Sequence, residues 1–416
     1  MNLYLKGYCK GISGTILGFI LVVAIGARPI MAQEVNGIYT EAATKDLGEV
    51  TGKKSLKGIK FRGWFEAYIE RNFNDPNGSV VNANQGLSVV KARDLKIEGR
   101  TFDVRSDSFR FSLGEIEIEK VPERNRLGFK LDLAVGDAQN IIFDSVRLAS
   151  PRSVRGADRV IQHASVSYLA PVGKGLRIDV GKFVTHIGGE TIESIKNRNF
   201  SHSYYYTYGI PFQDTGVRLN YAFSPKLYGE FYALKGWNVT FDNNTGKTFG
   251  LTLGYTPNPK LSVYANYLGG PERNSNSRDR RDLGDFQIVY SLTSTLQTMV
   301  NIDIGSDENA VAPGKAAKWW GVTSYVRKNI KGRFFPTVRA EYYNDRDGFT
   351  TGVAQHIGSF TFTGDYKVGN KDGFVKFMLR PEVRLDVSDG RFFSEGNNFR
   401  ARKQQFTAGV GFVTYF

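Results

Sequence analysis

The stretch Gln405–Phe416, QFTAGVGFVTYF, has the two-residue period of a β-strand. Phe406, Phe412 and Phe416 fall on one face, whereas Thr407 and Tyr415 fall on the other. Successive side chains of a strand point to opposite faces, and a helix would need a period of 3.6 residues. A strand with one apolar face and a final aromatic residue is typical of a closed barrel that places this aromatic in a membrane interface. The last strand of a soluble β-sandwich would also alternate, so the rest of the chain has to decide.

Composition favours a membrane barrel over a bundle of membrane helices. The 416 residues include 13% aromatic residues and 46 glycines. The mean hydropathy is −0.31, which is too polar for a helical membrane protein. A barrel that alternates lipid-facing with water-facing side chains reaches this average and still spans a bilayer.

The N-terminus has the features of a secretory signal. Lys6 and Lys10 precede an apolar run at 12–27, and small residues lead to Ala32. The run is too short for a comfortable membrane-spanning helix, which favours a cleaved signal over an uncleaved anchor. We therefore predict a signal peptide at 1–32, a periplasmic lead-in at 33–56 and a barrel at 57–416. The only cysteine, Cys9, would leave with the signal.

The chain carries a basic excess that is spread along its length. Its formal charge is +14, and loss of the three basic residues of the signal would leave +11. Such an excess suits nucleic acid, anionic lipid headgroups or anionic solutes. Because an exported barrel does not meet nucleic acid, we expect outer-membrane lipid, lipopolysaccharide and small hydrophilic solutes as partners.

Alternating segments recur along the whole mature chain. They are joined in turn by short turns rich in Pro, Gly, Asn and Ser and by long polar connections, among them 186–213 and 306–318. This rhythm is typical of an up-and-down barrel with two unlike sides. We therefore predict a transmembrane antiparallel β-barrel of about 16 strands with both ends on the short-turn side. The expected strands are 60–73, 108–119, 126–136, 160–170, 175–185, 214–223, 227–237, 248–256, 261–269, 283–292, 296–305, 319–328, 334–344, 359–368, 374–387 and 405–416.

Three positions interrupt this pattern. The apolar phase of 108–119 slips at Gly114, which predicts a β-bulge there. Pro336 and Pro381 fall inside expected strands, where each removes a donor from the ladder. A local bulge is the expected accommodation for both prolines.

Several blocks of the sequence resemble the OmpL-like β-barrel porin family. One is Gly181–Thr185 with Gly188, Glu190 and 199–201, and Pro211 with 214–218 and Tyr221 extends it. The others are 339–345 with Asp347 and Gly348, then 380–386 with Ser388, and the terminal Phe416. The sequence departs from the family pattern at His186, His202 and Gln213–Asp214. The resemblance implies an outer-membrane porin of a Gram-negative bacterium, for passive diffusion and ion transport, without naming a solute.

Strand alternation assigns charged side chains to the interior of the barrel. An Arg or Lys on the lipid face would cost about 2–4 kcal/mol at mid-bilayer. These side chains either form salt bridges that stiffen the wall or create a field that orients solutes. The expected pore-lining residues are Arg62, Glu66, Lys130, Asp132, Arg177, Asp179, Arg218, Arg339, Glu341, Lys376, Arg380, Glu382, Arg384 and Asp386.

The connection 186–213 is the third long loop, and the third loop of general porins often narrows the channel. A short helix is expected over 190–199, carrying the constriction residues Glu190, Glu193, Lys196 and Arg198. The tyrosines at 204–206 and 208 would line or brace the constriction. The alternative is a surface loop that lies on the mouth of the barrel.

Motifs for catalysis, metals and cofactors are weak. The four histidines have no zinc spacing, and Asp345 and Asp347 lack the later ligands of a calcium loop. We therefore expect no metal, no cofactor and no enzymatic activity. The main prediction is an outer-membrane diffusion channel, monomeric or trimeric, with a mild preference for anions. The alternatives are a plugged structural or adhesive barrel, and a lipid hydrolase built on Ser201, His202 and Ser203.

Overall fold

The computed structural model describes residues 55–56, 58–77, 79–82, 89–92, 96–149, 156–369 and 375–416. The predicted signal peptide and nearly all of the lead-in lie outside these residues. No α-helix in the described ranges combines the length and the apolar character that a membrane-spanning helix needs.

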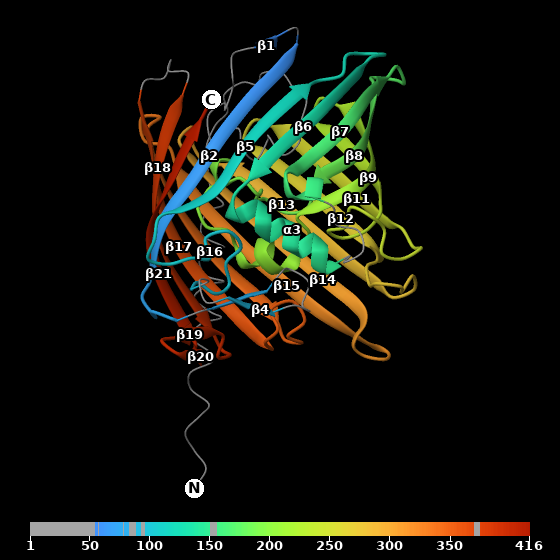
Figure 1. Ribbon diagram of the computed structural model, residues 1–416. Helices are drawn as coiled ribbons and strands as arrows, with labels where there is room; N and C mark the ends of the chain where they lie inside the picture. The colour runs from blue at the N-terminus through green and yellow to red at the C-terminus, as the bar shows by residue number, and fades with distance from the viewer. Residues whose placement is uncertain are drawn as a thin grey trace.

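Sixteen antiparallel strands form a closed barrel, as predicted (Figure 1). Consecutive strands pair with one another, and the last strand, β21, closes the ring by pairing with both β18 and β2. A short β1 (Ser55–Leu56) pairs with the start of β2. The strands are β2 (Ile59–Asn72), β5 (Arg110–Lys120), β6 (Leu127–Val135), β7 (Ile161–Ala170), β8 (Leu176–Val184), β9 (Gln213–Ser224), β10 (Leu227–Leu234), β11 (Thr248–Asn258), β12 (Leu261–Pro271), β13 (Arg280–Ser291), β14 (Leu296–Ala312), β15 (Lys315–Lys328), β16 (Phe334–Asp345), β17 (Gln355–Val368), β18 (Lys376–Ser388) and β21 (Gln404–Tyr415).

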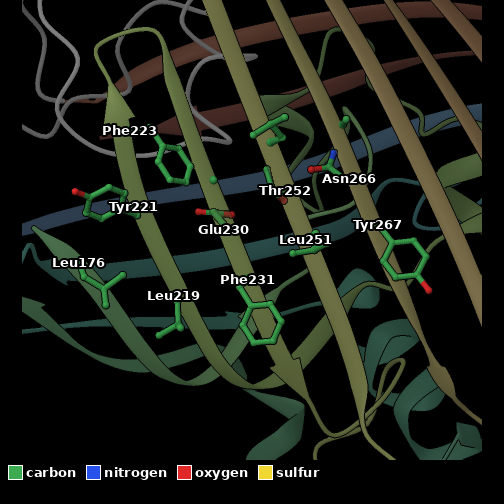
Figure 2. A pocket seen from close by; sticks show the side chains of 13 residues that line it. Leu176, Leu219, Tyr221, Phe223, Glu230, Phe231, Leu251, Thr252, Asn266 and Tyr267 are labelled. Carbon is green, nitrogen blue, oxygen red and sulfur yellow. The ribbon is translucent and has the colours of Figure 1, made fainter. Parts of the chain in front are cut away.

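Polar and apolar side chains are distributed in the reverse of a soluble protein: the charged side chains of the strands are buried and many large apolar ones are exposed. In β18, Arg380 and Arg384 are buried, whereas Val383 and Leu385 are exposed on the outside. An apolar outer face with polar residues inside is the pattern of a barrel in lipid. Figure 2 shows the same alternation across β8–β12, where large apolar side chains such as Phe231 border an open groove of about 580 Å³ on the outer face.

The two ends of the barrel differ. Short turns and the C-terminus lie at one end, and the β19–β20 hairpin lies at the other (Figure 1). The longer connections contain β3 (Ser79–Asn82), β4 (Val89–Ala92), α3 (Asp137–Ala149), η2 (Gly156–Arg159), η3 (Ser194–Lys196), η4 (Tyr205–Gly209), β19 (Phe393–Glu395) and β20 (Asn398–Arg402).

The prediction of a long loop at 306–318 is wrong. β14 and β15 continue instead to a tight turn at Pro313–Gly314, where Gly314 has a φ of +75°. Residues 308–315 are mostly exposed on both faces of this hairpin. A strand that meets water on both sides needs no apolar face, so the alternation that marks the other strands is absent here.

The predicted β-bulge in β5 is present but lies two residues earlier than Gly114. Glu66 of β2 pairs with Leu113 and Ala67 pairs with Phe111, so Ser112 is the extra residue. Leu113 consequently points inward and is buried, whereas a slip at Gly114 would have placed it outside.

Neither proline produces a bulge. Pro336 lies one residue beyond Thr337, the last position of β16 that pairs with β15, so its missing N–H removes no bond on that side. Pro381 lies where pairing with β17 is interrupted between Glu382 and Leu379, and the register is the same on both sides. The ladder therefore loses pairing at Pro381 without a shift of the strands.

Candidate functional site

The segment 186–212 lies inside the barrel, where it packs against the inward side chains of the wall. None of its residues is exposed, and all of those from 197 to 212 are buried. Its helical structure is limited to the 3₁₀ turn η3 and the π-helix η4, so the helix expected over 190–199 shrinks to one turn. A buried segment without regular structure needs partners for its backbone groups.

Carboxylates of the wall accept many of the segment's N–H groups. Glu66 of β2 accepts from Ser194 and Ile195 at 3.2 and 3.0 Å. Glu382 of β18 accepts from the Phe200 N–H at 2.8 Å, and Glu341 of β16 accepts from the Tyr204 N–H at 2.7 Å. Bonds to an ionised acceptor are among the stronger ones in proteins.

Arginines of the wall donate to the segment's carbonyl groups. Arg380 donates to the carbonyls of Ser194 and Asn197. Arg339 donates to those of Ser201 and His202, and Arg384 to that of His202 at 2.6 Å. Wall acids and wall arginines together replace the ladder that an inserted segment lacks, and we call this arrangement the clamp: Glu66, Arg339, Glu341, Arg380, Glu382 and Arg384.

The three arginines of the clamp and its Glu341 are ion-paired. Arg339 lies 3.1 Å from Glu190 of the inserted segment, and Arg380 lies 2.7 Å from Asp365 of β17. Burial by itself would raise the pKa of Glu190, but Arg339, His202 and hydrogen bonds from Ser203 outweigh burial and hold this pKa below its ordinary value. Glu190 is therefore ionised at neutral pH.

A second segment, 96–107, packs beside the first. Arg100 is fully buried, 2.8 Å from Asp103 and 3.5 Å from Asp386 of the wall. Phe102 packs against Tyr206 and Phe212. Together with the inward apolar side chains of the strands, the two segments build an apolar core inside the barrel.

Another part of the interior presents basic groups to water. Arg62, Lys130, Arg177 and Arg218 keep 15%, 23%, 18% and 23% of their side chains accessible. Their carboxylate partners lie beneath them: Glu117, beside Arg62 and Lys130, is 2% accessible, and Asp179, beside Arg177 and Arg218, is fully buried. Lys196 of the inserted segment is a fifth such residue, and 25% of its side chain is accessible. We call these five residues the basic lining.

The predicted pore-lining residues thus separate into two groups. Arg62, Lys130, Arg177, Arg218 and Lys376 are partly accessible. The remaining nine are buried, most of them under the inserted segment: Glu66, Asp132, Asp179, Arg339, Glu341, Arg380, Glu382, Arg384 and Asp386. Of the predicted constriction residues, Glu190, Glu193 and Arg198 are buried as well.

Sequence reasoning missed several members of this network. Glu117 and Asp365 alternate with outward apolar residues, so the two-residue period of their strands was enough to place both on the inner face. Arg100 lies outside the barrel strands, and no periodic pattern marks it.

The proposed hydrolase residues do not lie at a lipid-facing rim. His202 is buried within the inserted segment, and its Nε2 lies 2.7 Å from the carbonyl of Thr191. Ser203 donates its hydroxyl to Glu190, and Ser201 lies beside Arg339. Within the described ranges, no three or more His, Cys, Asp or Glu side chains gather in a way that could hold a metal ion.

A closed sixteen-stranded barrel with an apolar outside, a charged inside and an inserted third loop defines an outer-membrane barrel of the porin type. The chain belongs to the family described as "Putative beta-barrel porin-2, OmpL-like", which it matches over residues 58–416. A search of curated protein sequences found no match.

Solved structures share the fold at low sequence identity. The outer membrane channel DcaP of Acinetobacter baumannii is 12% identical, with a TM-score of 0.51 over 88% of this chain and 99% of that one. The anion-selective porin from Comamonas acidovorans is 9% identical, with a TM-score of 0.51 over 86% of this chain and 99% of that one. At these identities the likeness concerns the fold alone.

Proposed function

We propose that the chain is a channel for passive diffusion of small hydrophilic solutes, with a mild preference for anions. The proposal rests on the basic lining. Its basic side chains are accessible to water, whereas the carboxylates that pair with them are buried beneath. Solutes would pass beside the clamped segment along β2 and β6–β9. The clamp fixes the width of the passage, and the lining sets its charge preference.

The electrostatic argument depends on which charges meet water. A buried ion pair presents a small net field, whereas a guanidinium head at the water boundary attracts anions directly. Low-dielectric walls focus this field into the passage, and salt screens it over about 8 Å at physiological ionic strength. The preference should therefore weaken as the salt concentration rises.

Planar-bilayer recording of the refolded chain 33–416 tests the proposal. Stable ohmic steps are expected, with a reversal potential of anion-selective sign in a salt gradient. The double variant Arg177→Gln with Arg218→Gln should move the reversal potential toward zero. Lys226→Gln, which removes an exposed lysine from a short turn, is the matched control and should leave it unchanged. Equal reversal potentials in the wild type and the double variant would contradict the proposed role of the lining.

A plugged barrel is the second candidate. The apolar core that the two inserted segments share with the wall favours it, because Phe102, Tyr206 and Phe212 are all buried within the ring of strands. A folded, heat-modifiable protein that gives no conductance steps would support this candidate and overturn the diffusion channel.

We also propose that residues 1–32 are removed on export and that the mature protein is monomeric or trimeric. N-terminal sequencing of protein from the outer membrane tests the first statement. Native mass spectrometry in detergent tests the second.

A further inference from the structure

The groove on the outer face of β8–β12 is a hollow in one row of paired residues (Figure 2). Its volume of about 580 Å³ falls within the range of about 300–1,000 Å³ that is usual for ligand pockets. The row that forms its floor contains two small residues, Gly229 of β10 and Ala265 of β12. The full row is Tyr221, Gly229, Leu253 and Ala265, and the next row along the strands is Leu219, Phe231, Leu251 and Tyr267. Large side chains therefore border a floor that lacks them.

A hollow in a lipid-facing wall differs from a flat wall. Acyl chains are as apolar as the wall itself, so inside a bilayer there is no hydrophobic gain in covering a flat surface. A chain that lies in a hollow touches side chains on several sides, and these van der Waals contacts add up. The shape of the groove thus favours an acyl chain, but shape alone does not select a headgroup.

Two basic side chains meet beside the groove at the short turn 171–175. Lys174 is exposed, and its Nζ donates to the carbonyl of the groove residue Phe223 at 2.6 Å. Arg124, from the preceding short turn, is also exposed and donates to two carbonyls of turn 171–175 at 3.3 and 3.4 Å. An ammonium has three donors and a guanidinium has five, so both groups have donors for a further acceptor.

The side chain of Tyr221 joins the groove to this turn. Its ring lines the groove, and its hydroxyl accepts the Lys174 N–H at 3.4 Å. A Cβ atom at Gly173 would lie 2.3 Å from this hydroxyl, so the glycine allows the ring to reach the turn. A phenol with an apolar ring and a polar tip suits the level where lipid tails meet headgroups.

The short turns around this point carry a basic excess. Their one acid, Glu123, lies 3.0 Å from Arg126. Short turns form the periplasmic end of an outer-membrane barrel. Each basic residue near an anionic lipid surface strengthens binding by about fivefold. The turns 121–126, 171–175, 224–226 and 256–261 contain Arg124, Arg126, Lys174, Lys226 and Lys260.

We propose that this groove binds one glycerophospholipid with a net negative headgroup, taken from the periplasmic leaflet. One acyl chain lies in the hollow over Gly229 and Ala265, and the phosphate is bound by Arg124, Lys174 and the Tyr221 hydroxyl. Lipopolysaccharide would approach from the opposite leaflet, at the end with the long connections. A second copy of the chain would bring its own basic short turns to the same depth, where like charges repel.

Native mass spectrometry of the refolded chain 33–416 in detergent tests the proposal. Titration with dioleoylphosphatidylglycerol should fill one site. Dioleoylphosphatidylcholine has the same acyl chains and no net charge, and it should bind at least about tenfold more weakly. Lys174→Glu should weaken binding of the phosphatidylglycerol at least about fivefold and leave that of the phosphatidylcholine unchanged. Ala265→Phe, which fills the hollow, should weaken binding of both lipids.

Matched controls make the same changes away from the groove. Lys328→Glu reverses an exposed charge at the short-turn end of β15, and Ala340→Phe enlarges a side chain on the outer face of β16. Both variants should bind the two lipids as the wild type does. Heat-modifiable migration shows which variants are folded, and Lys174→Glu decides if Ala265→Phe does not fold.

Four results would overturn the proposal. The first is equal affinity of the wild type for the two lipids, and the second is unchanged phosphatidylglycerol binding in Lys174→Glu or in a folded Ala265→Phe. The third is displacement of the phosphatidylglycerol by lipopolysaccharide at equal concentration. The fourth is a lipid-free dimer or trimer that Ala265→Phe dissociates, which would make the groove an interface between copies. None of these readouts involves conductance, so they are independent of the proposed channel function.

Discussion

Replacing Arg339 by Met should release the inserted segment without opening the barrel. Arg339 is fully buried, lies 3.1 Å from Glu190 and 3.5 Å from Glu341, and donates to the carbonyls of Ser201 and His202. Methionine fills a similar volume with a flexible, uncharged chain. The substitution therefore removes the donors and the charge while it limits the cavity.

The magnitude follows from what is left behind. Glu190 would remain buried after losing its cation, whereas Glu341 would keep Arg384, 3.2 Å away. Breaking a buried ion pair from one side costs about 3–5 kcal/mol, mostly because of the orphaned charge. At about 1.4 kcal/mol per factor of ten, this corresponds to an increase of about 10²–10⁴-fold in the released population of the segment. The strand ladder contains no bond from the Arg339 side chain, so the barrel itself should remain closed.

Three readouts check this prediction. The released segment should expose Lys196 and Arg198 to trypsin, and single-channel conductance should rise or become noisy. Heat-modifiable migration on gels should persist, because the barrel stays folded. Arg177→Met is the matched control for the trypsin and gel readouts: it removes the same charge from a wall position that pairs with Asp179 and does not touch the segment.

The double variant Arg339→Met with Glu190→Gln sharpens the test. It removes the orphaned charge of Glu190 and should recover part of the lost trypsin resistance. Wild-type conductance and wild-type trypsin resistance in Arg339→Met would refute the clamp as the element that holds the segment.

Three further predictions concern pH and backbone geometry. The pKa of Glu190 is lowered, so its ionised form stabilises the folded protein above pH 4.5, and this stabilisation is lost as the pH falls below that value. The melting temperature should therefore drop in acid. In Glu190→Gln the drop in melting temperature should be smaller. Burial raises the pKa of Glu98 to about 7, so stability should fall by about 3 kcal/mol as the pH rises from 4.5 to 7. Glu98→Gln should abolish that slope in thermal unfolding, and an unchanged slope would count against the burial of Glu98. Gly181→Ala should lower the folded yield, because Gly181 has a φ of +150° and a Cβ there would lie 2.1 Å from the carbonyl oxygen of Ala164. Gly284→Ala, with open space around it, is the control and should fold normally.

The sequence determined the strands because their pattern is local. Within the bilayer each strand must bury an apolar face in lipid and turn its polar face inward, so the two-residue period of 405–416 appears in every spanning segment. The same period placed Arg62, Arg384 and the other charged wall residues on the inner face. It failed at 308–315, where both faces of the hairpin meet water and no alternation is required.

Only the tertiary structure decided what fills the barrel. The backbone groups of 186–212 find partners on strands more than a hundred residues away. Glu66 and Glu382, for example, accept hydrogen bonds from this segment, and no local period encodes such contacts. Charge type and strand face are properties of a few neighbouring residues, whereas compensation of a buried charge depends on how the whole chain closes on itself.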